Sequence, residues 1–122
     1  MLNEIREKTA GWLSGILSQG GDSTRIFHRL PEGLPDAAAL EITGVTFPGR
    51  TILPEAEAVF ILRRASAGDL NRDISLVMAN LPLYDWNGIA SLVLKDVEYR
   101  KELCGGRERF TARVTIAAAA AR

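Results

Sequence analysis

The 122-residue sequence contains one cysteine and one histidine, and neither sign of charge is in excess. Because Cys104 is alone, no internal disulfide and no thiolate metal cluster can form, and a reducing compartment is expected. Fifteen basic and fifteen acidic residues give a net charge of zero. That balance argues against a protein that binds nucleic acid or an anionic membrane through bulk electrostatics, so neither partner is predicted.

Targeting and membrane-spanning segments are also lacking. The first eight residues alternate charged and apolar positions, unlike the apolar centre of a signal peptide, and no run approaches 18 apolar residues. The sequence therefore predicts a soluble protein that no signal peptide exports.

Common catalytic motifs are absent as well. The sequence has no GxGxxG, GxxxxGK[ST] or HExxH pattern, no nucleophile elbow and no acidic calcium loop. His28 has no second histidine or cysteine nearby to share a metal, and we interpret it as an ordinary strand residue. Cys104 has no evident base to activate it. We therefore predict no catalytic, metal or cofactor site and no cofactor, although fifteen acidic residues leave a carboxylate-only active site open.

What is present is an ordinary globular composition, 47% hydrophobic and 25% charged, which predicts one domain over residues 1–122. Its central stretch, residues 55–81, changes period halfway. The first half alternates like a strand, with Ala56, Ala58, Phe60 and Leu62 on one side. The second half predicts a helix from residue 70 to 81, capped by Asp69, whose apolar positions are Leu70, Ile74, Val77, Met78 and Leu81.

The flanking segments complete an α+β pattern. A first helix is predicted from a stripe of Leu2, Ile5, Thr9, Trp12, Leu13, Ile16 and Leu17, which leaves Glu4, Arg6, Glu7 and Lys8 on the surface. Strands are predicted at 24–30, where Pro31 ends the strand, and more briefly at 38–42.

Two antiparallel strands close the chain, at 91–99 and 109–116. The second is expected to turn Phe110, Ala112, Val114 and Ile116 inward and Thr111, Arg113 and Thr115 outward. We therefore predict a single α+β domain with a mainly antiparallel sheet of four to five strands and two helices, in the order α-β-(β)-β-α-β-β.

Two groups of residues are candidates for contact with other chains. Residues 44–53 predict a loop, yet Val45, Phe47, Ile52 and Leu53 are apolar and must be buried, either on their own core or against a neighbouring subunit. The pair Arg63 and Arg64 lacks a glycine-rich phosphate loop, so we interpret both as exposed, salt-bridged or inter-subunit charges. The candidate interface comprises Val45, Phe47, Arg50, Ile52, Leu53, Arg63 and Arg64.

The sequence has a family likeness in three features. These are the order of elements, the strand Ala58–Arg64 that leads into the second helix, and the closing segment Gly106–Val114. It resembles the small tail terminator, tail completion and minor capsid proteins of long-tailed bacteriophages. The resemblance implies a non-enzymatic structural protein that forms a homo-oligomeric ring, commonly a hexamer, at the head-proximal end of the tail. Its implied partners are its own copies, the tail tube and head-completion proteins, and its implied locations are the host cytoplasm during assembly and then the virion tail.

Two alternatives from other classes stay open. The first is a small bacterial adaptor or regulatory domain that binds one protein partner and has no role in a virion. The second is a small α+β enzyme that uses carboxylates. A ring is physically compatible with the charge distribution, because residues 1–62 carry a net charge of −3 and residues 63–122 a net charge of +3.

Overall fold

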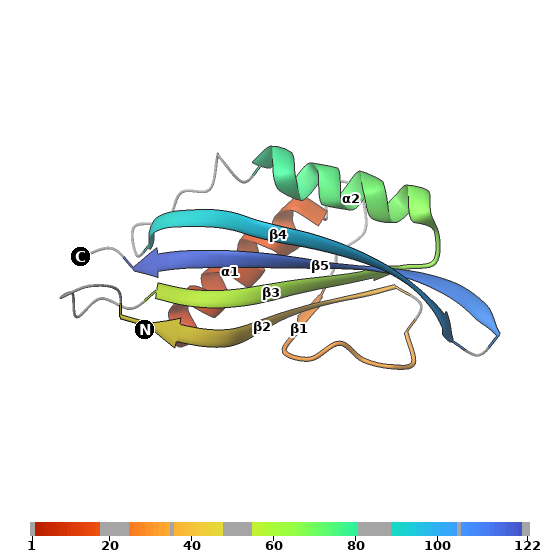
Figure 1. Ribbon diagram of the computed structural model, residues 1–122, viewed down its shortest axis with the longest axis horizontal. Coiled ribbons are helices and arrows are strands. Elements are labelled where there is room, and N and C mark those ends of the chain that lie inside the picture. The colour runs from red at the N-terminus through yellow and green to blue at the C-terminus, as the bar shows by residue number, and fades with distance from the viewer. Residues whose placement is uncertain are drawn as a thin grey trace.

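Two helices pack on one face of a five-stranded sheet (Figure 1). The computed structural model describes residues 2–17, 25–34, 36–47, 55–80, 89–104 and 106–120, and only the backbone of residues 2–5, 89–91, 104, 119 and 120. Its elements are α1 (Leu2–Leu17), β1 (Ile26–Phe27), β2 (Ala37–Thr46), β3 (Glu55–Arg64), α2 (Ala67–Asn80), β4 (Ile89–Cys104) and β5 (Arg107–Ala120). The predicted α+β fold, with this order of elements, is confirmed.

Strand β3 lies in the middle of the sheet, whose strand order is β1-β2-β3-β5-β4. It pairs antiparallel with β5 along its whole length and with β2 from residue 55 to 63, so that Phe60 lies between Leu40 and Val114. The β4–β5 pair is also antiparallel, and only the short β1 runs parallel to its neighbour β2. The central position explains why β3 is apolar on both faces from Ala58 to Leu62, where all five residues are buried.

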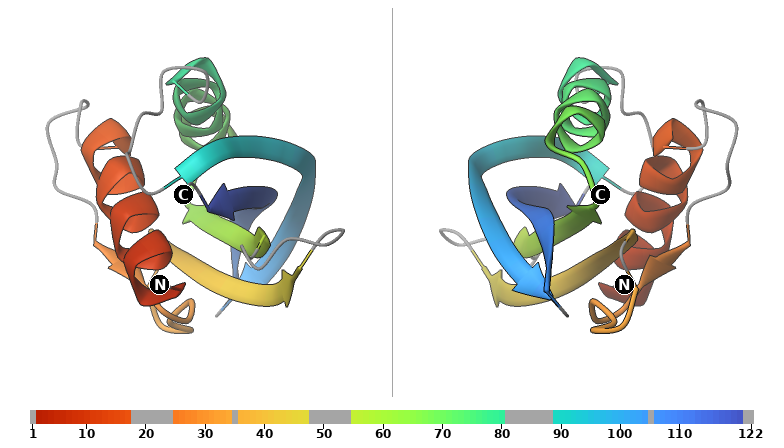
Figure 2. Two further views of the ribbon diagram at one scale, coloured as in Figure 1. Left: turned by 90° about the vertical axis from the view of Figure 1, so that its left-hand side faces the viewer. Right: turned by 90° about the vertical axis from the view of Figure 1, so that its right-hand side faces the viewer.

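The core lies between the helices and the near face of the curled sheet, which Figure 2 shows end-on. The alternate residues predicted for this face, Ala56, Ala58, Phe60 and Leu62, are all buried. Burial of a side chain such as Phe60 contributes roughly 1.5–3 kcal/mol. The facing helical side chains are Ala10, Leu13, Ile16 and Leu17 of α1 and Leu70, Ile74 and Val77 of α2.

The opposite face of the sheet is more buried than predicted. Thr111, which the alternation places outward, is buried, as are Val59 and Ile61 of β3. The segment after β1 lies against this face, because Arg63 donates hydrogen bonds from Nη1 to the backbone oxygens of Pro31 (2.6 Å) and Leu34 (3.2 Å). The segment after β1, which is distant along the chain, thus covers strand positions that the alternating pattern predicts to be exposed.

Several predicted boundaries were wrong. Strand β1 has two residues instead of seven, whereas β2 continues four residues beyond the predicted end, to Thr46, with a bulge between Ile42 and Gly44. Pairing with β3 holds this extension in the sheet, although Gly44 in isolation indicates a turn. Strands β4 and β5 are also longer than predicted, and the alanine-rich end, which composition alone left undecided, continues β5 to Ala120.

The start of α2 also differs. The helix begins at Ala67, and the hydroxyl of Ser66 accepts a hydrogen bond from the amide of Asp69 at 3.3 Å. Ser66 is therefore the N-cap, and the assignment of that role to Asp69 was wrong. Asp69 instead lies in the first helical turn, where a carboxylate favours the positive end of the helix. Met78, predicted on the apolar face, is half exposed, and Leu81 lies outside the described residues.

Candidate assembly surface

The outer end of β2 exposes two of the apolar residues that the sequence predicts to be buried. Phe47 is 61% exposed and Val45 is 37% exposed. The residues that continue this apolar group, Ile52 and Leu53, lie outside the described residues, as does Arg50. Of the two alternatives that the sequence left open, the exposure of Val45 and Phe47 excludes burial on the core of their own chain.

The free edge of β2 lies next to these side chains. Strand β1 pairs with β2 only at Ala38 and Ala39, so within the described part of the chain no strand pairs with this edge from Leu40 to Thr46. On its other edge the same stretch pairs with β3, and the hydroxyl of Thr43 reaches the carbonyl of Glu57 at 3.1 Å. Pairing with β3 holds the unpaired edge extended, apart from the bulge between Ile42 and Gly44, and an extended unpaired edge can accept another strand.

Arg63 and Arg64 both make contacts within their own chain. Arg63 is only 7% exposed, so its interpretation as an exposed charge was wrong; its guanidinium is occupied by the two carbonyls of the segment after β1. Arg64 forms the salt bridge that the sequence suggested, through Nε to a carboxylate oxygen of Asp73 at 2.8 Å. The pair joins the end of β3 to α2.

The sequence analysis did not identify Asp73 as the partner of Arg64, although its spacing indicates a buried position. Asp73 lies three residues after Leu70 and four before Val77, which is the spacing of the buried face of α2. An acidic residue at such a position requires a buried partner. Asp73 is 4% exposed, and Arg72 approaches its second carboxylate oxygen at 3.4 Å.

The β4–β5 hairpin carries a second exposed apolar group, which sequence reasoning also missed. Strand β3 pairs with β5 only as far as Phe110, so residues 102–109, which we call the arm, pair only with each other among the described residues. Leu103 on the arm is 75% exposed, and Tyr99, four residues before it on β4, is half exposed. The turn contains Gly106 with φ of +79°, a conformation that favours glycine.

Three consecutive charged residues, Arg100, Lys101 and Glu102, separate Tyr99 from Leu103 on β4. The hydrogen bond from Arg100 Nε to Glu98, at 2.7 Å, and the charge of Glu98 raise the pKa of Arg100. Lys101 pairs with Glu108 across the arm at 2.9 Å. The arm therefore presents Leu103 within a set of fixed charges, a mixture common at the rim of a protein interface.

The two exposed apolar groups lie at opposite ends of the molecule. Strand β2 ends at one end of the long axis, and the turn that joins β4 to β5 lies at the other (Figure 1). Two different patches at opposite ends suit a head-to-tail contact between copies, which closes into a ring when the rotation between neighbours permits it.

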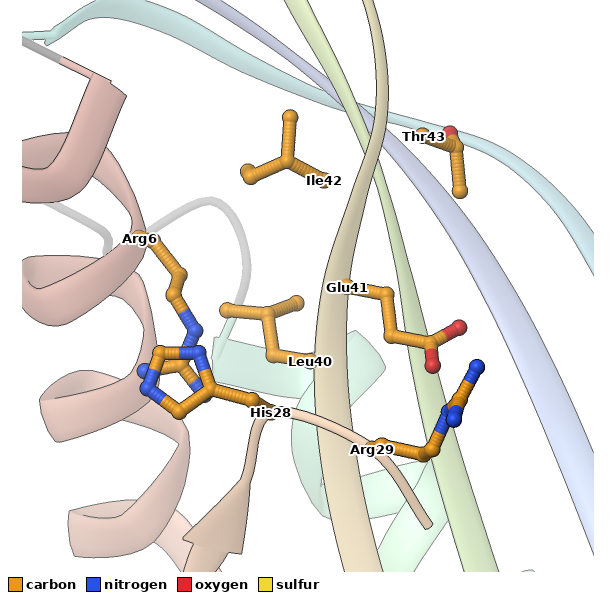
Figure 3. Close-up of a pocket in the computed structure, with 7 residues that line it drawn as sticks. All are labelled: Arg6, His28, Arg29, Leu40, Glu41, Ile42 and Thr43. Carbon is orange, nitrogen blue, oxygen red and sulfur yellow. The ribbon is translucent and has the colours of Figure 1, made fainter.

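A cavity of about 520 Å³ opens at the free edge of β2 (Figure 3). His28 lines it from one residue beyond β1, together with Arg29 from the same segment, and both are exposed. Arg6 of α1 lines it as well, although the sequence predicted this side chain on the surface; it is 7% exposed. The prediction for Arg6 was wrong because the residue sits one turn before Thr9 and Ala10, both of which are buried.

The side chain of Cys104 lies outside the described residues, and its backbone ends β4. No group of three or more metal-ligating side chains converges among the described residues. No helix in the described part of the chain is long and apolar enough to cross a membrane. In comparisons with known proteins, no protein-family model matches the sequence and no curated protein matches it.

Proposed function

We propose that this protein is a non-enzymatic structural component that assembles with copies of itself into a ring. The observation that carries the proposal is the exposure of Phe47, with Val45, at the end of a strand whose outer edge no described strand pairs from Leu40 to Thr46. Exposure of a large aromatic side chain leaves apolar surface in contact with water, and a protein partner removes that cost. The arm with Leu103 supplies a second and different patch at the far end of the molecule.

The biological role we propose is that of a tail terminator or tail completion protein of a phage or prophage, in which a ring of copies, commonly a hexamer in the family it resembles, caps the tail tube and supports head joining. The support is the family likeness of the sequence together with an α+β fold of this order of elements. Its partners would be the tail tube and the head-completion proteins, and its sites the host cytoplasm and then the virion tail. Genes for a portal, a tail tube and a tape-measure protein beside this gene would support the role.

Light scattering after size-exclusion chromatography tests the assembly. We expect the wild type at about 100 µM to elute as a multiple of the 13.3 kDa chain. Phe47→Ser and Leu103→Ser each remove one exposed apolar patch and should shift the mass toward that of one chain. Met78→Ser is the matched control, because Met78 is half exposed on α2, away from both patches.

Two results would count against the ring. One is a wild type that stays monomeric at this concentration, which would favour the adaptor alternative, in which an unrelated partner covers Phe47. The other is an oligomer whose mass neither Phe47→Ser nor Leu103→Ser changes.

A further inference from the structure

Arg6 is a buried cation with unused hydrogen-bond donors. Its Nη1 donates to Glu7 at 2.8 Å, but Nε and Nη2 have no acceptor among the described residues and are closed off from water. The side chain of Glu7 is itself 65% exposed, so solvent screens its charge. A guanidinium carries five N–H donors, and a buried donor without an acceptor loses its bond to water without replacement. An acceptor for Nε and Nη2 is therefore expected.

The cavity at the free edge of β2 is where such an acceptor fits. Figure 3 shows Arg6 reaching from α1 toward the same space as the ring of His28, with Leu40 and Ile42 projecting from β2 on this side. Glu41 and Thr43 project from the opposite side of β2, where the carboxylate of Glu41 faces Arg29. Glu41, the acidic residue that lines this cavity, therefore points away from Arg6.

The chemistry of the missing acceptor follows from geometry and charge. Nε and Nη2 form one edge of the guanidinium, and their two parallel N–H groups match the two oxygens of a carboxylate. The charged and titratable groups around the cavity are Arg6 and Glu7 on α1, His28 and Arg29 after β1, and Glu41 on β2. Arg29 and Glu41 face each other on the other side of β2, so Arg6 is the one arginine that faces this side, and a single positive charge suits a single negative charge better than a phosphate dianion. Ile42, which is partly buried, offers apolar contact for a short aliphatic chain, whereas Leu40 beside it belongs to the core.

We propose that this cavity is a carboxylate-binding site in which Nε and Nη2 of Arg6 hold the two carboxylate oxygens. The carboxylate can come from a free aliphatic acid or from an Asp or Glu side chain of a neighbouring copy. Entry requires the exposed ring of His28 to turn aside, and exposed side chains change rotamer within nanoseconds. His28 therefore acts as a movable cover of Arg6.

Titration with butyrate tests the site, since butyrate resembles both a free acid and a glutamate side chain. In ¹H–¹⁵N spectra of the wild type we expect a saturable shift of the Arg6 Nε–H signal with a Kd below about 10 mM. Butanol, which lacks the charge, should cause no such shift, and inorganic phosphate should bind more weakly. His28→Ala should bind butyrate at least as tightly as the wild type does.

The matched variants are Arg6→Met and Arg29→Met, which make the same change on opposite sides of β2. Arg6→Met should weaken butyrate binding on the order of tenfold or more, whereas Arg29→Met should leave it within about twofold. Circular dichroism checks that both variants fold. If Arg6→Met does not fold, the Arg6 signal of the wild type still decides the question.

The source of the carboxylate is distinguished by a second measurement, which rests on the proposed self-assembly. If a neighbouring copy supplies the acid, Arg6→Met lowers the oligomer mass and butyrate competes with assembly; if a free acid is the ligand, the mass is unchanged. A monomeric wild type would refute the assembly but leave the butyrate titration valid. The proposal is overturned if the Arg6 signal shows no saturable shift and Arg6→Met leaves assembly intact, or if phosphate binds more tightly than butyrate.

Discussion

Whether a charged residue is buried or exposed determines how much its substitution should destabilise this fold. Arg64 and Asp73 lie 2.8 Å apart with side chains that are 11% and 6% exposed, and both have given up most of their water. Lys101 and Glu108 lie at nearly the same separation, 2.9 Å, but their side chains are 61% and 52% exposed. The two ion pairs have similar distances, but removal of one partner costs more stability in the buried pair. There the remaining charge has no water to replace its lost partner, whereas the exposed charge is solvated.

Asp73→Ala should lower the free energy of unfolding by about 3 kcal/mol, since it leaves the Arg64 guanidinium buried without its carboxylate. The double variant Arg64→Met with Asp73→Leu should recover most of that loss. Urea denaturation measures both, and Glu108→Ala is the exposed control, with an expected change within about 1 kcal/mol. Equal losses in Asp73→Ala and Glu108→Ala would contradict the assignment.

At the scale of elements, a few hydrogen bonds fix the joint between β3 and α2. Ser66 starts α2 by accepting the amide hydrogen of Asp69, and the amide of Leu70 bonds to the carbonyl of Ser66 at 3.1 Å. At the same joint, the amide of Ala65 donates to a carboxylate oxygen of Asp36 at 3.3 Å. The turn from β3 into α2 is therefore held from both sides, which keeps α2 over the sheet.

Ser66→Ala should destabilise the protein by about 1 kcal/mol, because the first turn of α2 loses its side-chain cap. Ser75→Ala provides a control of opposite sign. Ser75 is exposed within the same helix, where alanine is the better helix former by about 0.5 kcal/mol. Midpoints of thermal unfolding for the two variants should therefore move in opposite directions. A shift in the same direction would show that Ser66 does not cap α2.

On the scale of the whole molecule, the two halves of the sequence interleave. Strand β3 from the first half pairs with β5 from the second, and Glu57 lies 3.4 Å from Lys95 of β4. The net charges of −3 and +3 that distinguish the halves in sequence are therefore not separated onto two faces. The ring that we propose depends instead on apolar groups at the two ends of the long axis.

Removal of the arm tests whether it serves assembly and not the stability of the core. Replacement of Leu103–Glu108 by Asn-Gly joins Glu102 to Arg109, which face each other across the hairpin, through a two-residue turn. The melting temperature should change by only a few degrees, because the arm pairs with no other described strand, whereas the oligomer mass should fall to that of one chain. Retained assembly would exclude the arm as a contact, and loss of the folded state would show that it supports the core.

The sequence by itself determined the elements and their order, because hydrophobic periodicity is local: alternation marked Ala56 to Leu62 as a strand, and helical spacing marked Leu70, Ile74 and Val77 as one face. Two apolar faces of this kind bury each other, so the α+β class followed. The tertiary structure alone decided that Arg63 and Thr111 are buried, because the segment after β1, which is distant along the chain, lies against that face of the sheet. It also decided that Phe47 stays exposed, since extension of β2 carries that residue away from the core.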